Sequence, residues 1–378
     1  MRVLLFANTD WYLYNFRLAL AEHLREHGAH VILVSPNGAY GEKLRALGFE
    51  WCEFDFERKG TNPFDELRTL NRLTRLYEAV VPDLVHHFTI KCVLYGGIAA
   101  RRLGIPTVSA VTGMGHVFTT HTMKNAILRP LVSAAYRYAL KRSQVIFQNP
   151  DDRTDFLLRG LVTTPQANLI RGSGVNVTRF RTKPSTVITE RLRTRIVFVG
   201  RLLREKGVAE FVEAARIVRT LHPDIRFQIA GEPDEGNPSS ISFSQIRKWV
   251  NEGNVEWLGH CPEILAVLWD SDICVLASYR EGTPRSLLEA AACGLPLVAT
   301  DVPGCREICR DGVNGILVPP RDAKAVAVAI VRLIDDPALC HAMGLRSREI
   351  AVAEFSEEKV IAETVKVYQA AQRSQIFL

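Results

Sequence analysis

The chain has 378 residues, of which 47% are hydrophobic and 23% are charged. This length and composition exclude a disordered or fibrous chain and fit a folded protein of two domains. The first apolar run ends at Asn8 and is too short for the core of a signal peptide, so we interpret it as a strand. No window of about 18 apolar residues offers a membrane span.

Eight cysteines are scattered along the chain without a CxxC pair. Cys305 and Cys309 are the one close pair with a suggestive spacing, and no histidine-rich cluster accompanies them. We therefore expect reduced thiols, no metal site and no cofactor.

The net charge of +6 is unevenly distributed. Residues 1–182 carry 23 Lys and Arg against 15 Asp and Glu, whereas residues 183–378 carry 24 against 26. Between Leu84 and Pro150 there are eight basic residues and no acidic one. Such a stretch predicts a positive face with an anionic partner, either phosphate, a lipid headgroup or nucleic acid.

Apolar, β-branched runs alternate with helical patterns throughout the chain, which predicts parallel sheets covered on both faces. A helical period from Asn15 to Glu26 follows the first run, and further helices separate the later ones. The predicted strands are 2–7, 30–35, 84–88, 107–111, 145–148, 195–200, 226–231, 255–259, 273–278, 295–300 and 315–320.

The alternating pattern breaks after Arg181, where the polar segment 183–195 carries Pro184. We interpret it as a linker between an N-terminal domain, 1–182, and a C-terminal domain, 183–378. The expected architecture is α/β, with two Rossmann-like, doubly wound domains facing across a cleft. Ligands of such sheets bind outside the carboxyl ends of the strands, so the chemistry is expected there.

The first motif is GRLLREKG, residues 200–207, between a predicted strand and a helix that starts near Val208. Arg201 and Lys206 flank this turn and place two cations beside a helix N-terminus, which favours binding of an anion. Alone the motif is weak, because cations near a turn are often simply solvated.

The second motif is REGTPRSLLEAAACGLP, residues 280–296. Glu281 lies on the loop after a predicted strand, and Glu289 lies on the helix that follows. Thr283 is expected as the N-cap and Pro284 at the first helical position. A site of this kind can hold a diphosphate on the first amides, hydroxyls on Glu289 and a sugar on Glu281. The alternative is a helix with ordinary acids near its positive end.

These two motifs and the segment GILVPP, 315–320, resemble the large retaining glycosyltransferase family 4, of the GT-B fold. In the N-terminal half, the segments WYLYNFR, RKGTNP, PDLVHHFTIK and TGMGHVF, which begin at residues 11, 58, 82 and 112, resemble a subgroup that builds bacterial surface polysaccharides. Some of its members act on undecaprenyl-diphosphate-linked sugars. The resemblance covers nearly the whole chain.

The resemblance implies a metal-independent transferase in which Arg201 and Lys206 neutralise the diphosphate of the donor. Glu289 would bind the ribose hydroxyls and Glu281 the donor sugar. The implied donor site also includes Gly282, Thr283, Pro284, Ser286 and Leu287. His116 would lie near the reacting sugar as a further catalytic residue. The last helix, about 357–372, would pack back on the N-terminal domain.

Polar residues after the predicted N-terminal strands are candidates for the acceptor side: Asn8, Asp10, Asn15 and Asn149. Asn15 is also interpretable as a helix cap. His86 and His87 end a strand, and one of them either faces the cleft or is a buried core histidine. Asp270 and Asp272 resemble a metal-binding DxD pair, but they precede a strand at its amino end, so we expect solvated acids.

The predicted reaction is the transfer of a hexose or N-acetylhexosamine, with UDP as the expected leaving group, to a lipid-linked saccharide. Two alternatives stay open, a sugar-nucleotide epimerase of the same fold and a non-catalytic nucleotide-sugar-binding protein. Nucleic acid is not an expected partner, because no recognition helix accompanies the basic stretch.

The segment from Lys124 to Arg142 mixes cations with apolar residues, so we expect it to associate with the anionic cytoplasmic face of the inner membrane. Its helix is expected to start or kink at Pro130. Tyr136 and Tyr138 would insert into this interface or else belong to the core.

Overall fold

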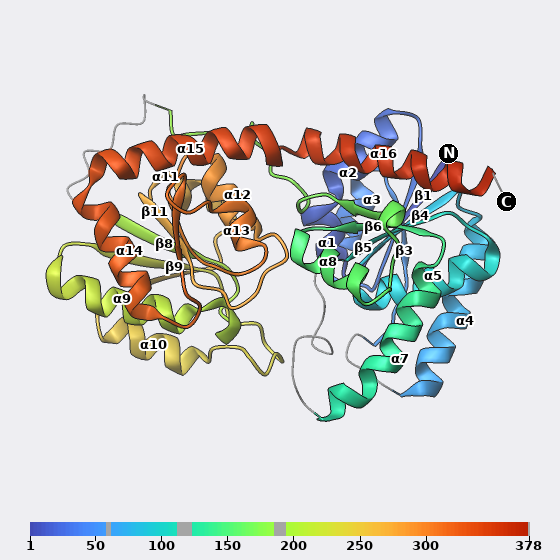
Figure 1. Cartoon of the computed structure of the whole chain (residues 1–378), viewed down its shortest axis with the longest axis horizontal. Helices are drawn as coiled ribbons and strands as arrows, with labels where there is room; N and C mark the ends of the chain where they lie inside the picture. The colour runs from blue at the N-terminus through green and yellow to red at the C-terminus, as the bar shows by residue number, and fades with distance from the viewer. Residues whose placement is uncertain (58–61, 112–122, 185–193, 377–378) are drawn as a thin grey trace. The chain divides into compact units, whose positions relative to one another are not determined.

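In the computed structural model, which describes residues 1–57, 62–111, 123–184 and 194–376, the chain forms two compact units. The first comprises Met1–Ser173 and Val360–Leu378, and the second comprises Gly174–Lys359. The boundary expected at residue 183 lies beside the segment 185–193, which is outside the described residues. Figure 1 labels many of the elements of both units.

The first unit contains a sheet of seven strands in the order β3-β2-β1-β4-β5-β6-β7, and all its pairings are parallel. Its elements are β1 (Arg2–Phe6), α1 (Asp10–Phe16), α2 (Leu18–Glu26), β2 (His30–Ser35), α3 (Gly41–Ala46), β3 (Glu50–Glu53), α4 (Pro63–Val80), β4 (Leu84–Phe88), α5 (Ile90–Leu103), β5 (Thr107–Val111), α7 (Met123–Leu140), β6 (Ser143–Phe147), α8 (Pro150–Leu158), η1 (Thr164–Gln166) and β7 (Ala167–Leu169).

The second unit contains a parallel sheet of six strands in the order β10-β9-β8-β11-β12-β13. Its elements, followed by the final helix, are β8 (Arg195–Val199), η2 (Arg204–Lys206), α9 (Val208–Leu221), β9 (Arg226–Ala230), α10 (Phe243–Asn251), β10 (Glu256–Gly259), α11 (Ile264–Trp269), β11 (Ile273–Leu276), α12 (Arg285–Ala292), β12 (Leu297–Thr300), α13 (Cys305–Ile308), β13 (Gly315–Val318), α14 (Ala323–Asp335), α15 (Pro337–Phe355) and α16 (Glu357–Ile376).

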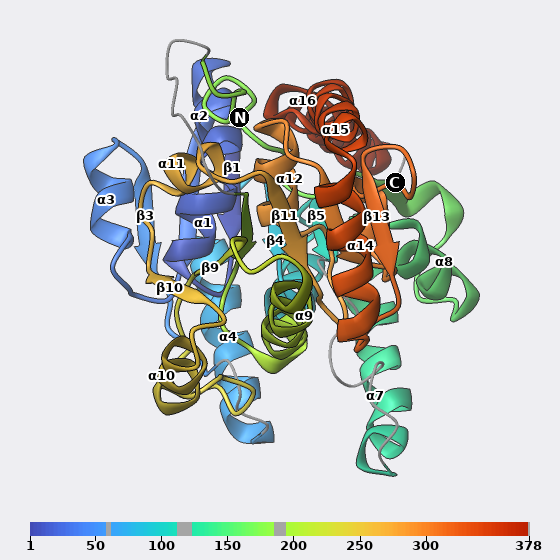
Figure 2. The same ribbon diagram turned by 90° about the vertical axis from the view of Figure 1, so that its left-hand side faces the viewer.

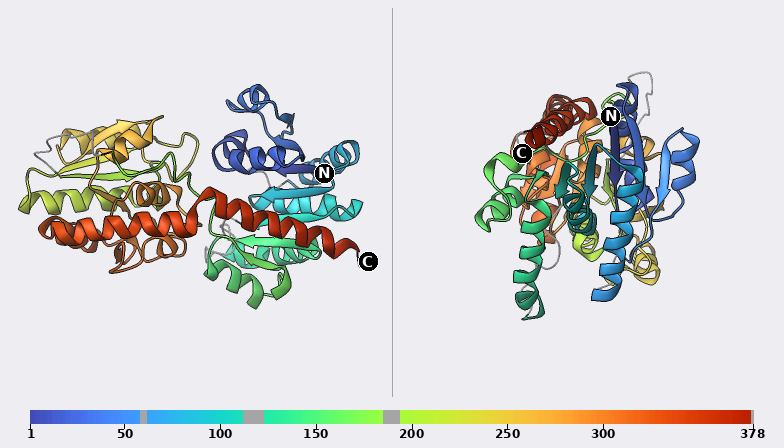
Figure 3. Two further views of the ribbon diagram at one scale, coloured as in Figure 1. Left: turned by 90° about the horizontal axis from the view of Figure 1, so that it is seen from above. Right: turned by 90° about the vertical axis from the view of Figure 1, so that its right-hand side faces the viewer.

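Both sheets are covered by helices, as continuous apolar strands require. In the second unit α9 packs beside α14, and α12 packs beside α15; α9 and α14 are easily followed in Figure 2. In the first unit α16 contributes Val360, Val367 and Tyr368 to the core that contains β1 and β4. Figure 3 shows this last helix running along the first unit to the C-terminus. The predicted α/β class with two doubly wound sheets is confirmed.

Two local expectations are wrong. The helical pattern expected from Asn15 to Glu26 is divided at Arg17 into α1 and α2. The loop expected after β1 is mostly helix, because α1 begins at Asp10 and Thr9 caps it by accepting a hydrogen bond from the amide of Tyr12. Pro130 lies inside α7, so the helix does not start there, and a kink at this residue stays a prediction.

Candidate active site

The turn that carries Lys206 lies directly against the end of β11. Gly207 follows η2 with a φ of 72°, and a Cβ atom at this position would lie 2.0 Å from the carbonyl oxygen of Ala277. Only glycine permits both the left-handed backbone and this close approach. The glycine of the sequence motif therefore places Lys206 beside the loop that follows β11.

Hydrogen bonds from that loop hold the turn in place. The carbonyl oxygen of Glu205 accepts from the amide of Tyr279 at 2.8 Å and lies 3.0 Å from the hydroxyl of Ser278. Ser278 is fully buried, and its hydroxyl also lies 2.7 Å from Oε1 of Glu281. Ser278 thus connects the turn to the loop glutamate.

Lys206 and Glu281 form an ion pair in which Nζ lies 2.5 Å from Oε1. The side chains are 22% and 10% exposed, respectively, so the pair is largely shielded from water. The Coulomb attraction within a shielded pair is stronger than within a surface pair, and it holds the ammonium group in position. One Glu281 oxygen therefore receives both the ammonium group and the Ser278 hydroxyl.

Arg201, the other cation of the motif, is more accessible. Its NH1 donates to Oδ2 of Asp234 at 2.7 Å, while 64% of its side chain remains exposed. An arginine with this exposure retains donors for an incoming anion. The partner Asp234 was not anticipated from the sequence.

Glu289 lies on α12 with its carboxyl group buried. Oε1 accepts from Nε of Arg285 at 2.8 Å. Burial raises the pKa of Glu289, against the opposite influence of the guanidinium groups of Arg285 and Arg179. Arg285 was missed in the sequence, although a spacing of four residues on a helix is a recognisable signal for an ion pair.

The start of α12 differs from the expectation. The helix begins at Arg285, Pro284 is the residue before it, and no side chain caps it, so Thr283 is not the N-cap. Gly282, Thr283 and Ser286 are half-buried, whereas the side chain of Leu287 belongs to the hydrophobic core. Only the backbone of Leu287 is left to contact a donor.

The acceptor-side candidates have structural partners in the first unit. Both Tyr40 and Gly41 donate their amides to Oδ2 of Asp10, at 2.7 and 2.8 Å. Asn149 caps α8 by accepting from the amide of Asp152. Asn15 donates to the carbonyl of Trp11 within α1, so it does not cap that helix.

Three histidines are candidates for the site from the sequence, namely His86, His87 and His116. His116 lies outside the described residues. His86 and His87 are both buried, and burial lowers the pKa of each, to about 3 for His87. They are core histidines that are neutral at ordinary pH.

Both acids of the DxD pair bind Arg195, the first residue of β8. Asp270 forms an ion pair with the guanidinium of Arg195. The carboxylate of Asp272 accepts a hydrogen bond from the backbone amide of Arg195 at 2.8 Å. These acids are therefore engaged with the protein, where solvated acids were expected.

Cys305 and Cys309 are free and buried, and burial raises the pKa of both thiols. Within the described ranges, no group of three or more His, Cys, Asp or Glu residues is arranged to hold a metal.

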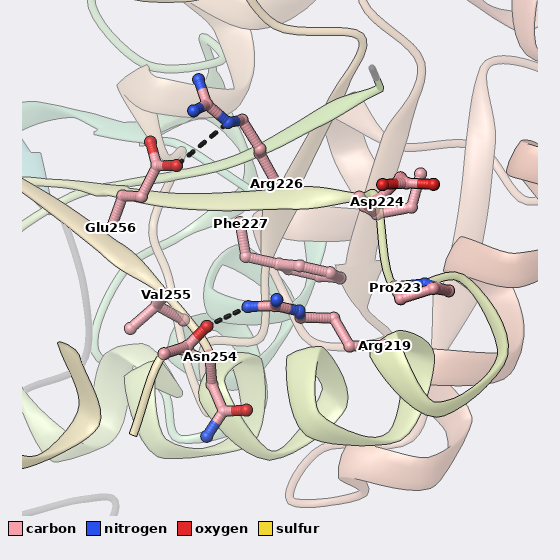
Figure 4. Close-up of a pocket in the computed structure, with 10 residues that line it drawn as sticks. Arg219, Pro223, Asp224, Arg226, Phe227, Asn254, Val255 and Glu256 are labelled. Carbon is pink, nitrogen blue, oxygen red and sulfur yellow. Dashed lines mark hydrogen bonds and ion pairs between the residues drawn. The ribbon is translucent and has the colours of Figure 1, made fainter. Parts of the chain in front are cut away.

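One small hollow lies away from these groups. Figure 4 shows it at the amino ends of β9 and β10, where Arg226 pairs with Glu256 and Arg219 donates to the carbonyl of Gly253. Because ligands of parallel sheets bind at the carboxyl ends, this hollow is not the candidate site.

The two halves of the chain match two family models. Residues 193–336 match "Glycosyl transferases group 1", and residues 2–149 match "Glycosyl transferase 4-like". EpsD of Bacillus subtilis, whose name assigns it to the glycosyltransferases, is 31% identical over 82% of this chain and 82% of its own length. The chain therefore belongs to the group 1 glycosyltransferases, and it is a glycosyltransferase of the GT-B fold.

Further relatives extend over most of the chain. The N,N'-diacetylbacillosaminyl-diphospho-undecaprenol alpha-1,3-N-acetylgalactosaminyltransferase of Campylobacter jejuni is 27% identical over 97% of this chain and 98% of its own. Among solved structures, HepE of Anabaena in complex with UDP and glucose matches with a TM-score of 0.79, at 20% identity, over 98% of this chain and 99% of its own. The predicted family and reaction class are confirmed, and the epimerase alternative has no support.

Proposed function

We propose that the protein transfers a hexose or N-acetylhexosamine from a UDP-sugar to a lipid-linked saccharide, with retention of configuration. The observation that carries this proposal is the fixed pair of Lys206 and Glu281 beside α12, which bears Glu289. A diphosphate that departs from the sugar gains negative charge, and a fixed ammonium group stabilises it without reorganisation.

In this proposal each group has a separate task. Lys206 and Arg201 face the diphosphate, Glu281 contacts the donor sugar, and Glu289 accepts hydrogen bonds from the ribose hydroxyls. Gly282, Thr283 and the first amides of α12 shape the sugar pocket, and His116 assists near the reacting carbon. Asn8, which is half-buried after β1, is retained as a candidate for the acceptor side together with Asp10, Asn15 and Asn149.

The donor and acceptor classes rest on the relatives. One relative, from Escherichia coli, is named UDP-Gal:alpha-D-GlcNAc-diphosphoundecaprenol alpha-1,3-galactosyltransferase and is 25% identical over 80% of this chain. We assign the same classes of substrate here, a UDP-sugar and a saccharide on a lipid diphosphate.

The direct test is a panel of nucleotide sugars, first by thermal stabilisation and then by transfer to lipid-linked saccharides. We expect UDP and one UDP-sugar to raise the Tm, since a ligand at 100 times its Kd stabilises by about 2.7 kcal/mol. Release of UDP should then require the acceptor. Conversion of the nucleotide sugar without an acceptor would support the epimerase instead.

Transfer should continue in excess EDTA. The cations that face the diphosphate belong to the protein, and Asp270 and Asp272 are engaged with Arg195. The measurement is the initial rate of transfer before and after chelation. Loss of turnover that manganese or magnesium restores would contradict this expectation.

We also propose that the protein associates with an anionic membrane surface through α7. Among the described residues, no helix has the length and hydropathy needed to cross a bilayer. On α7 and the residues after it, Leu131 and Tyr138 are 68% and 45% exposed, and Lys141 and Arg142 are exposed beside them. Tyr136, in contrast, is buried in the core.

Liposome sedimentation tests this surface. We expect the protein to pellet with anionic vesicles, to stay free of neutral ones and to be released by salt, since each cation near the surface contributes about 1 kcal/mol. Reversal of Lys141 and Arg142 to glutamate should abolish pelleting. Arg137 is left unchanged, because it donates to the carbonyls of Gly160 and Arg159.

A matched control reverses Lys324 and Arg332, two exposed cations of α14. This variant should pellet like the wild type. If both variants lose pelleting equally, the effect depends only on net charge and not on α7. If the wild type does not pellet with anionic vesicles at low salt, membrane association is contradicted.

A further inference from the structure

Arg17 is a buried cation at the junction of α1 and α2. Only 6% of this residue is exposed. Its guanidinium lies 4.3 Å from the centre of the Phe88 ring, and NH2 donates to the hydroxyl of Tyr12 at 2.9 Å. The Nε atom is buried and has no hydrogen-bond partner. The guanidinium is thus held in a fixed plane with donors that the protein does not use.

No carboxylate in the described part of the chain pairs with Arg17. Asp10, on the same helix pair, has its carboxylate engaged by the amides of Tyr40, Gly41 and Trp11. The stretch from Leu84 to Pro150, which includes β4 beneath Arg17, contains no acid. Burial of a charge is costly unless an opposite charge compensates it. By comparison, Lys91 in the same unit pairs with Glu66 at 2.7 Å.

The neighbours of Arg17 carry no compensating charge either. Nδ1 of His86 lies 2.7 Å from the hydroxyl of Tyr368, and its Nε2 is buried without a partner. Burial lowers the pKa of His86, and the charge of Arg17 adds to that effect, so the imidazole is neutral. Burial raises the pKa of Tyr368, so its phenol keeps the proton. The cluster has one positive charge and unused polar atoms on both Arg17 and His86.

We propose that Arg17 anchors an anion site in the first unit and that its ligand is a diphosphate group of a substrate. The planar guanidinium suits this ligand, because it can donate two parallel hydrogen bonds to phosphate oxygens. The inference rests on the proposed function, in which the acceptor and the donor each carry a diphosphate. Either one can supply the ligand, and the experiment distinguishes the two.

The competing interpretation is that Arg17 only packs on Phe88. Arg25 on α2 provides a matched control for it, because its guanidinium lies 4.2 Å from the Phe49 ring and NH1 donates to the carbonyl of Leu47. The variants are therefore Arg17→Met, Arg17→Lys and Arg25→Met. Lysine keeps the positive charge and the aliphatic part of the side chain but lacks the planar guanidinium with its parallel donors. The lysine variant therefore still tests the proposal if the methionine variant does not fold.

The measurement is calorimetric binding of UDP to each folded variant, followed by inorganic pyrophosphate titrated into the UDP-saturated protein. UDP occupies the donor site, so pyrophosphate then reports a separate anion site. If the acceptor supplies the diphosphate, wild type and Arg25→Met bind pyrophosphate beside UDP. Arg17→Met and Arg17→Lys then bind it roughly 10- to 100-fold more weakly. If the donor supplies it, UDP affinity itself falls by this factor in the Arg17 variants and pyrophosphate does not bind beside UDP.

The inference is overturned if Arg17→Lys, or a folded Arg17→Met, keeps both affinities within twofold of the wild type. It is also overturned if the Arg25 variant loses as much. These outcomes differ from failure of the proposed function, in which the wild type itself would neither bind UDP nor transfer sugar.

Discussion

Replacement of Lys206 by methionine is expected to lower kcat by roughly 100- to 1,000-fold, the typical loss when one fixed group that stabilises transition-state charge is removed. Methionine keeps most of the stem but removes the ammonium group that lies 2.5 Å from Glu281. The affinity for UDP should change much less, because the leaving diphosphate gains its extra charge only in the transition state.

Steady-state kinetics with the donor varied, together with calorimetric UDP binding, separate these effects. Arg204 offers a matched control, since it is an exposed cation of the same η2 turn. Arg204→Met should retain nearly full turnover. A loss in Lys206→Met that appears wholly in the donor KM would assign Lys206 to ground-state binding and contradict its role at the leaving group.

The central strands were predictable because their residues are apolar on both faces. The two strands that the sequence did not reveal, β3 and β7, lie at the edges of the first sheet. β3 begins and ends with Glu50 and Glu53, and β7 has only three residues. Edge strands are short and partly exposed, so their periodicity resembles that of a polar loop.

The break at Arg17 could not be predicted either, because the sequence around it has good helical periodicity. Tertiary contacts decide it, since the guanidinium packs on Phe88 from a distant strand. The first residue of α12 could not be predicted from the sequence either. Thr283 has the chemistry of a cap, but the loop brings Pro284 to that position.

In the candidate site, too, some residues could be predicted from the sequence and others could not. The two motifs, together with their resemblance to family 4, selected Lys206, Glu281 and Glu289 from the sequence. Their partners come from other parts of the chain, and no spacing rule predicts that Ser278 contacts both Glu205 and Glu281. Asp10 had the right residue type for an acceptor contact, yet its carboxylate accepts the amides at the start of α3.

Glu289→Gln is expected to weaken UDP binding by about 1.5–3 kcal/mol, or roughly 10- to 150-fold, the contribution of hydrogen bonds to a charged group. Glutamine has nearly the same volume, so the core around α12 should be retained. Glu213→Gln is the control, because Glu213 also pairs with an arginine on its own helix, but at an exposed position. It should leave UDP affinity unchanged.

A second measurement uses the titration of Glu289. Burial raises its pKa in the folded state, so the folded protein holds this proton more tightly than the unfolded chain does. The free energy of unfolding should therefore fall as the pH rises from the ordinary glutamate value through the raised one. Glu289→Gln should lack this part of the slope. The same variant should also bind uridine, which has no phosphate to titrate, with an affinity that no longer decreases toward acid pH. If the glutamine variant keeps wild-type affinity for UDP and for uridine, Glu289 does not bind the ribose and its carboxyl group serves only to pair with Arg285.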